Sequence, residues 1–224
     1  MITDDPATPG DGHWEINMAS LVNRTSPTSI TQLPLIDVNY GLGERIQLKV
    51  EMPWVLQDGA GPQLKGFGNA LAGVKWRFYD DGEEGWRIST YPQVAFSPST
   101  RSTQKGIARS GIGYLAPIEF LHSLGSGDIN FELGRWFRPA GQGDSWVMGA
   151  VLTREVRKGF ELILELHDEF AVHQILNHQL ILNLGTRWDL SDRFTLLAAL
   201  GRDLHNTLSE KDIFQSYVGL QTRF

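Results

Sequence analysis

Apolar and polar residues alternate along several short stretches of this chain. In the clearest stretch, residues 45–52, the apolar residues Ile46, Leu48, Val50 and Met52 are separated by charged or amide side chains. Successive side chains of a β-strand point to opposite faces, so this pattern predicts a strand with one apolar and one polar face. Such a strand separates a hydrocarbon environment from a polar one.

The same kind of pattern recurs about twelve times. The predicted strands cover residues 13–22, 33–41, 45–52, 74–79, 86–96, 113–121, 128–137, 146–152, 160–167, 179–187, 194–200 and 214–224. An even number of strands, each of about ten residues, is typical of barrels that cross the outer membrane of bacteria. The pattern therefore predicts an all-β fold, a transmembrane antiparallel up-and-down β-barrel of about 12 strands. The barrel domain is expected to cover residues 13–224, with residues 1–12 as a flexible N-terminal lead.

The connections between these strands differ in length. Those near residues 42, 82, 156 and 190 are short, and those near residues 28, 60, 104, 172 and 207 are longer. Short turns face the periplasm in outer-membrane barrels and long loops face outside, so both chain ends are expected on the periplasmic side. Residues 97–111 form the longest predicted loop, and residues 168–177 are expected to be either a loop or a helical turn.

The last stretch of the chain ends on an aromatic residue. Val218, Leu220 and Phe224 lie on one face of the predicted final strand. This ending resembles the assembly signal of bacterial outer-membrane barrels, in which the last strand closes on Phe. The resemblance implies an outer-membrane location, lipid and lipopolysaccharide as surroundings, and the barrel assembly machinery as a partner. Residues 1–12 lack the features of a signal peptide, which we expect to have been removed.

Composition narrows the class further. The mean hydropathy is −0.22, which suits a barrel because only alternate residues face lipid. The chain of 224 residues has no cysteine, so a disulfide framework and a thiolate metal site are excluded. It carries 20 basic and 26 acidic residues and a net charge of −6, and nucleic acid is therefore not an expected partner.

Charged and polar side chains on the polar faces of the strands are the candidate functional residues. We expect the lumen to be lined by Arg45, Lys49, Glu51, Lys75, Arg77, Arg87, Tyr91, Glu119, Glu132, Glu161, Glu165, Asn183, Arg187, Arg193 and Arg223. These residues either line a narrow polar path or pair across the interior and fill it, because buried charges persist only when they are paired. A barrel of about twelve strands lies between the filled and the open sizes.

A second group of titratable residues falls on or near the predicted outer loops. It comprises His167, Asp168, Glu169, His173, His178, Asp203 and His205. A histidine beside a carboxylate can activate water or bind a metal ion, but such residues are also ordinary in solvated loops. The chain has no Gly-x-Ser-x-Gly motif. We therefore predict no catalytic residue, no metal site, no cofactor and no enzymatic activity.

Several motifs together resemble one family. They are residues 12–17 (GHWEIN), 35–42 (LIDVNYGL), 51–53 (EMP) and 73–78 (GVKWRF), with the hairpin around residues 185–192 and the terminal strand. The chain resembles the outer-membrane proteins of the MetA-pathway of phenol degradation family, which are often described as transporters. This resemblance implies passive uptake of small molecules, with apolar or aromatic compounds as candidates. The alternative function is a plugged structural barrel that anchors a partner protein in the outer membrane.

Overall fold

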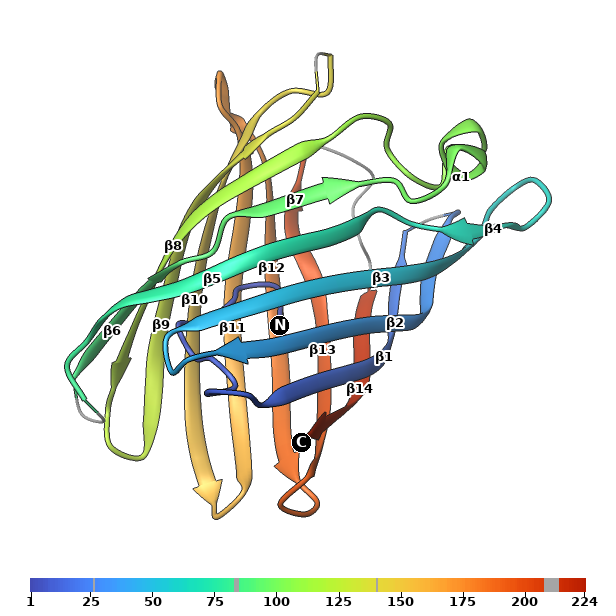
Figure 1. Cartoon of the computed structure of the whole chain (residues 1–224). Coiled ribbons are helices and arrows are strands. Elements are labelled where there is room, and N and C mark those ends of the chain that lie inside the picture. Colours follow the sequence, from blue (N-terminus) through green and yellow to red (C-terminus); the bar gives the residue numbers. More distant parts are fainter. Residues whose placement is uncertain (26, 83–84, 140, 208–213) are drawn as a thin grey trace.

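The computed structural model describes residues 1–25, 27–82, 85–139, 141–207 and 214–224. Antiparallel strands wind around a barrel, and a short helix lies beyond the ends of the strands, near β4 and β7 (Figure 1). The elements are β1 (Trp14–Arg24), β2 (Ser29–Leu42), β3 (Ile46–Asp58), β4 (Leu64–Phe67), β5 (Ala70–Asp80), β6 (Trp86–Thr90), β7 (Gln93–Phe96), α1 (Thr100–Gln104), β8 (Gly113–Ser123), β9 (Gly127–Phe137), β10 (Ser145–Arg157), β11 (Phe160–Ala171), β12 (Gln174–Asp189), β13 (Phe194–Asn206) and β14 (Phe214–Arg223). No helix in the described ranges is long and apolar enough to span a membrane.

The sheet closes on itself and has twelve strand positions, as the sequence predicts. β6 and β7 form a single position, interrupted at Tyr91 and Pro92, because both pair with β5 and with β8. β4 is a short hairpin partner at the far end of β3. The first and last strands are joined by ten register pairs, and the pairing of β3 with β5 completes the ring. A closed ring leaves no edge whose backbone groups lack partners in lipid.

The two faces of the wall have opposite character. In β3, Leu48 and Val50 are 40% and 49% exposed on the outer face, whereas Gln47, which precedes them on the other face, is buried. The largest fully buried side chains include Tyr91, Lys75, Glu119 and Glu165, so the interior of the barrel is mainly polar. This arrangement is inverted relative to a soluble barrel, in which apolar side chains fill the interior.

The connections lie at two opposite ends of the barrel. Those after β2, β5, β8, β10 and β12 form what we call the turn end, and those after β1, β3, β7, β9, β11 and β13 form the loop end. Both Trp14, where β1 begins, and Arg223, where β14 ends, lie at the turn end. The sequence predicts this alternation, which also puts the connections after β8 and β9 at opposite ends.

The prediction for residues 168–177 is wrong, since this segment is strand except for a two-residue turn. β11 continues to Ala171, and β12 begins at Gln174, so that only residues 172 and 173 separate the two strands. Phe170 is in register with His178, and the His178 ring lies 3.0 Å from the Asp168 carboxylate. Apolar alternation stops where a strand leaves the hydrocarbon, so it underestimates a hairpin that continues beyond it.

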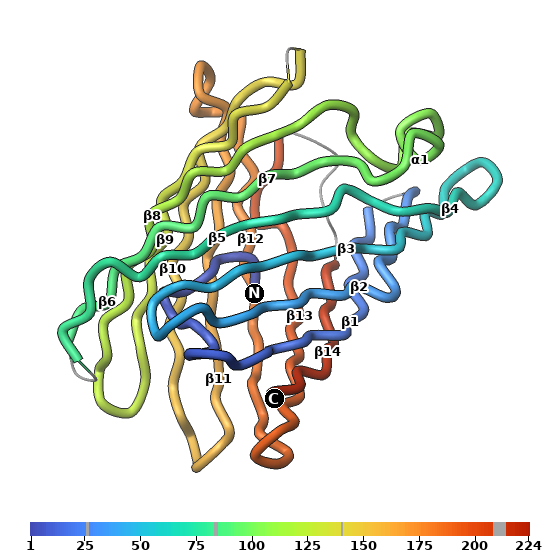
Figure 2. The backbone as a smooth tube through the Cα atoms, in the orientation of Figure 1, coloured from blue at the N-terminus to red at the C-terminus, as the bar shows by residue number. Residues whose placement is uncertain are grey.

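The N-terminal lead runs inside the barrel rather than away from it. In Figure 2 the first residues form a loop behind β2 and β3, within the ring of strands. The lead then reaches the turn end, where Asp11 accepts a hydrogen bond from the Gly43 N–H at 2.8 Å. The Gly12 N–H donates to the Gly41 carbonyl at 3.0 Å before β1 begins. The flexibility predicted for residues 1–12 stays a prediction, but their location is the lumen.

Candidate functional site: the lumen and its N-terminal segment

The tip of the lead is held by the wall formed by β10, β11 and β12. The backbone N–H groups of Ile2 and Thr3 donate to the Glu165 carboxylate at 2.9 and 2.6 Å. Asn183 donates to the second oxygen of that carboxylate at 2.7 Å, and the Thr3 hydroxyl lies 3.2 Å from the His167 ring nitrogen. Glu165 is thus a fully buried acceptor whose oxygens are satisfied mainly by the lead.

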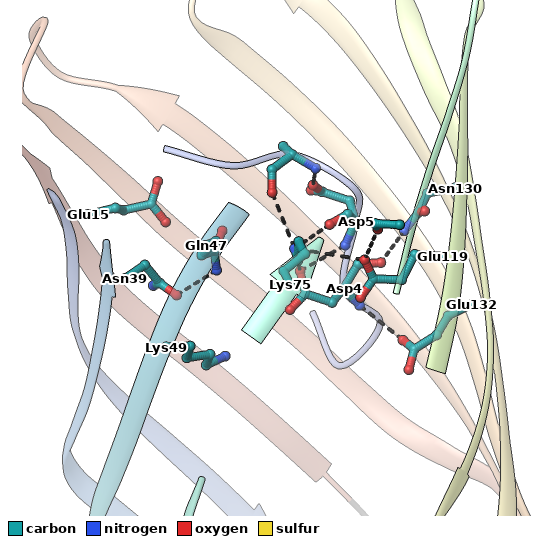
Figure 3. Close-up of polar contacts among 12 residues, drawn as sticks. Asp4, Asp5, Glu15, Asn39, Gln47, Lys49, Lys75, Glu119, Asn130 and Glu132 are labelled. Atoms are coloured by element: carbon teal, nitrogen blue, oxygen red, sulfur yellow. Dashed lines mark hydrogen bonds and ion pairs between the residues drawn. The ribbon is translucent and has the colours of Figure 1, made fainter. Parts of the chain in front are cut away.

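The next residue of the lead, Asp4, bridges two walls of the barrel (Figure 3). Its carboxylate lies 2.7 Å from the Lys75 ammonium on β5. Its backbone N–H donates to Glu132 at 3.1 Å, and its carbonyl accepts from Asn130 at 2.6 Å, both on β9. Lys75 also donates to the Asp5 carbonyl and lies 4.0 Å from Glu119. Because Lys75 is buried, the Asp4 carboxylate supplies a negative charge that helps to compensate its ammonium group.

Two glycines in the wall allow the lead to approach this closely. A Cβ on Gly149 of β10 would lie only 2.8 Å from the Thr3 Cβ and closer still to its hydroxyl. A Cβ on Gly41 of β2 would overlap the Gly10 carbonyl of the lead. Contacts this short are not tolerated between carbon atoms, so both positions need the absence of a side chain.

The charge state of Asp4 depends on its cationic neighbours. Burial tends to raise the pKa of Asp4, but the Lys75 and Lys49 ammonium groups outweigh burial and hold this pKa below its ordinary value. Asp4 is therefore a carboxylate at neutral pH, and its ion pair with Lys75 is intact.

A cavity remains beside the lead at the turn end. It has a volume of about 420 Å³ and lies between residues 4–9 and the wall that β1, β2, β3 and β14 form. Both charge signs line it, in the pairs Lys49 with Asp37 at 3.5 Å and Arg223 with Glu15 at 3.8 Å. The lead thus fills one side of the lumen and leaves a polar space on the other.

The structure divides the predicted lumen residues into three groups. Those that contact the lead, or contact a residue that does, are Lys75, Tyr91, Glu119, Glu132, Glu165 and Asn183. Those that line the cavity, or pair with a residue that lines it, are Lys49, Glu51, Arg187 and Arg223. The remaining residues are Arg45, Arg77, Arg87, Glu161 and Arg193, which lie close to the turn end.

Within this last group, two placements differ from the prediction. Arg45 and Arg193 lie in the turns before β3 and β13 and are exposed, so they belong to the rim rather than to the inner wall. Alternation does not distinguish the first residue of a strand from the last residue of a turn. By contrast, Arg77 and Arg87 are on strands, where they face Asp80 at 3.0 Å and Asp128 at 4.0 Å.

Opposite charges do not meet directly across the lumen as the sequence suggests. Lys49 pairs with Asp37 and Glu51 on its own side of the barrel, at 3.5 and 3.4 Å. Lys75 is linked through the lead to β9, three strand positions away, because Asp4 contacts both Lys75 and Glu132. Asp4 and Thr3 were not predicted as site residues, since contacts between an irregular segment and a wall follow no periodic pattern. Asn130 and Asp37 lie on the polar faces of β9 and β2 but were not among the predicted lumen residues.

The histidine and carboxylate group of the outer loops does not come together as one site. His167 and Glu169 point inward, where they contact Thr3 and Arg138. Asp168 and His178 lie on the outer face, and the His178 ring stacks on His205 with 4.5 Å between ring centroids. No cluster of three or more side chains suited to a metal ion occurs within the part of the chain that the structure describes.

Comparison with solved structures identifies the class of this barrel. The COG4313 outer membrane channel from Pseudomonas putida F1 matches with a TM-score of 0.84 and 12% identity over 100% of both chains. The KdgM porin, solved with disordered oligogalacturonate, matches with a TM-score of 0.64 and 10% identity, over 94% of this chain and 99% of that one. The NanC porin has the same TM-score at 9% identity, over 93% of this chain and 98% of its own. The fold is that of outer-membrane β-barrel channels.

No family model and no curated protein matches the sequence. At identities this low, likeness of structure shows the fold alone. Membership of the MetA-pathway family therefore stays a prediction from the motifs.

Proposed function

We propose that this protein is an outer-membrane channel for the passive uptake of small molecules, and that the lead controls how far its lumen is open. The observation that carries the proposal is the lead itself, held by Glu165, Glu132 and Lys75 beside a polar cavity. A segment held by a few polar contacts in a water-filled lumen can exchange those contacts for water when it moves. The turn end then faces the periplasm.

The fifteen candidate residues named from the sequence are proposed to line the solute path or its rim. Small apolar or aromatic compounds are the proposed solutes, and the motif resemblance supports them. Lipid, lipopolysaccharide and the barrel assembly machinery are the proposed surroundings and partner. The absence of enzymatic activity stays a prediction, supported by the channel and porin names of the similar structures.

Single-channel recording with a lockable lead tests this function. The chain has no cysteine, so Thr3→Cys with Gly149→Cys introduces one possible disulfide. The two Cβ positions are 2.8 Å apart, and an outward shift of about 1 Å gives disulfide geometry. We expect small conductance in the oxidised protein and larger, fluctuating conductance after reduction. Thr3→Cys alone controls for oxidation, and Gly149→Cys alone controls for displacement of Thr3 by a side chain at this position. Equal conductance in both states would show that the lead is not the gate.

The plugged structural barrel remains the second candidate function. The observation in its favour is that buried wall charges, above all Lys75 and Glu165, depend on the lead for compensation. Conductance of the full-length protein, compared with a variant that lacks residues 2–9, separates the two functions. Openings of the full-length protein support the channel, whereas a full-length protein with no openings, beside a folded deletion variant that conducts, supports the plugged anchor and overturns the channel.

A further inference from the structure

A second cavity lies at the loop end of the lumen, on the far side of the lead from the first. It has a volume of about 250 Å³ and is bounded by the ends of β5, β7, β8 and β9 and by the connections after β7 and β9. Leu71, Ala95 and Trp136 belong to the inward-facing series of their strands and form its inner surface. A solute that enters from the loop end therefore meets this cavity before it meets the lead.

Hydrogen bonds between loops order the rim of this cavity. Asn69 donates to the Arg109 carbonyl at 3.1 Å and accepts from the Arg109 N–H at 2.7 Å. Gln142 donates to the Ser110 carbonyl at 2.9 Å, which joins the connections after β7 and β9. Gly111 approaches Pro139 so closely that a Cβ there would lie 2.6 Å from the proline ring. The rim is therefore a built structure in which a ligand needs little further ordering of the protein.

The lining combines an apolar surface with charge of one sign. The charged residues that line the cavity, Arg109 and Arg138, are both basic. Arg138 is anchored, since it donates to Glu169 at 2.6 Å and lies 5.5 Å from the Trp136 ring centroid. The Arg109 guanidinium has no ion-pair partner among the residues placed in the structure, so it can accept an incoming anion.

We propose that this cavity binds a small amphipathic anion, with a carboxylate at Arg109 and an apolar or aromatic body against Leu71 and Trp136. The guanidinium fork matches a carboxylate in geometry and charge. An indole ring provides a flat apolar surface for a ring or an alkyl chain. The role of this site as the first binding position of a transported solute rests on the proposed channel function. Binding of the anion itself does not require that the barrel conduct.

Calorimetry with the full chain in lipid nanodiscs tests the proposal, with benzoate as the probe. Nanodiscs are needed because a detergent tail would compete for the apolar surface. Benzyl alcohol and benzylamine have the same ring with a neutral and a cationic group. We expect saturable binding of benzoate, weaker binding of benzyl alcohol and none of benzylamine.

Variants separate the site from general effects. Arg109→Gln keeps the backbone bonds to Asn69 and should weaken benzoate binding about five- to tenfold, as loss of a charge-assisted contact predicts. Arg101→Gln, on α1 outside the cavity, removes the same charge and should leave binding unchanged. Trp136→Leu should weaken benzoate and benzyl alcohol alike, because both use the ring surface.

Three results would overturn the site: no saturable benzoate binding, equal binding of all three probes, or equal effects of the two arginine variants. Conductance of the same preparations is read separately. Benzoate binding without conductance contradicts the channel and keeps the site, whereas conductance without benzoate binding contradicts only the site.

Discussion

The Lys75 ammonium lies 2.7 Å from the Asp4 carboxylate, and this ion pair joins the barrel wall to a segment that belongs to no strand. Lys75 is buried, whereas Asp4 is partly open to the cavity beside it. Lys75 is fixed in a strand of the wall, whereas Asp4 can move with the lead. The ion pair therefore holds the lead in its closed position and breaks when the lead moves.

Asp4→Asn should favour the open lead. The substitution removes a charge-assisted contact worth about 1–2 kcal/mol after allowance for partial exposure, roughly a five- to thirtyfold change in the ratio of open to closed states. The open probability of single channels in planar bilayers measures this ratio. Asp5→Asn is the matched control, because the Asp5 side chain caps the Ala7 N–H within the lead. Equal effects of both changes would mean that net charge, rather than this contact, matters.

The same pair predicts a response to acid. The pKa of Asp4 is lower in the folded protein than its ordinary value, so its stabilisation of the closed lead is fully present above about pH 4 and is lost as the pH falls through the lowered value. Open probability should therefore show no change from this group between neutral pH and about pH 5, and should rise below about pH 4. In the Asp4→Asn variant, the part of the rise in open probability below about pH 4 that Asp4 causes should be absent.

Gly149→Val should displace the tip of the lead, because its side chain would occupy the position of Thr3. The barrel should still fold, since valine favours strands. We expect higher conductance and faster proteolysis of residues 1–12 from the open side. Gly61→Val is a suitable comparison, as no atom lies within 4 Å of its Cβ position. An unchanged cleavage rate for Gly149→Val would contradict the placement of Thr3 against β10.

Leu164→Arg should destabilise the folded barrel by about 2–4 kcal/mol, the cost of a cation near the midplane of a bilayer. Leu164 is exposed on the outer face of β11 near its middle. The same substitution at Leu176, which is 83% exposed beside the connection after β11, should cost close to nothing. Urea unfolding in lipid vesicles compares the two, and equal costs would show that the outer face of β11 does not meet hydrocarbon.

Deleting Phe224 should lower the amount of assembled barrel in cells. The Phe224 backbone exchanges hydrogen bonds with Trp14, at 3.0 and 3.1 Å, at the seam between the first and last strands. Its ring is exposed on the outer face with Val218 and Leu220. Refolding into vesicles without any assembly factor serves as the control. Normal refolding in vesicles with poor assembly in cells indicates a recognition signal. Poor folding both in vesicles and in cells indicates that the barrel no longer closes.

The strands could be predicted because alternation reports directly on lipid contact. Leu48 and Val50 face outward as their spacing requires, and Gln47, which precedes Leu48, is buried on the other face. The ends of strands were predicted less well, since polar residues such as Asp168 and His178 continue β11 and β12 outside the apolar band. The site was only half predictable. Glu165 and Lys75 follow from the pattern, but their partners are backbone N–H groups and one carboxylate in residues 2–4, for which no periodicity exists.

The join between the lead and β1 also determines how the lumen closes again. Because the segment is tethered at Trp14, a displaced tip stays within a few tens of ångströms of Glu165, and its effective concentration is on the order of millimolar. Reclosure is then a unimolecular event whose rate does not depend on protein concentration. A free peptide of the same sequence competes poorly unless it is supplied at comparable millimolar levels.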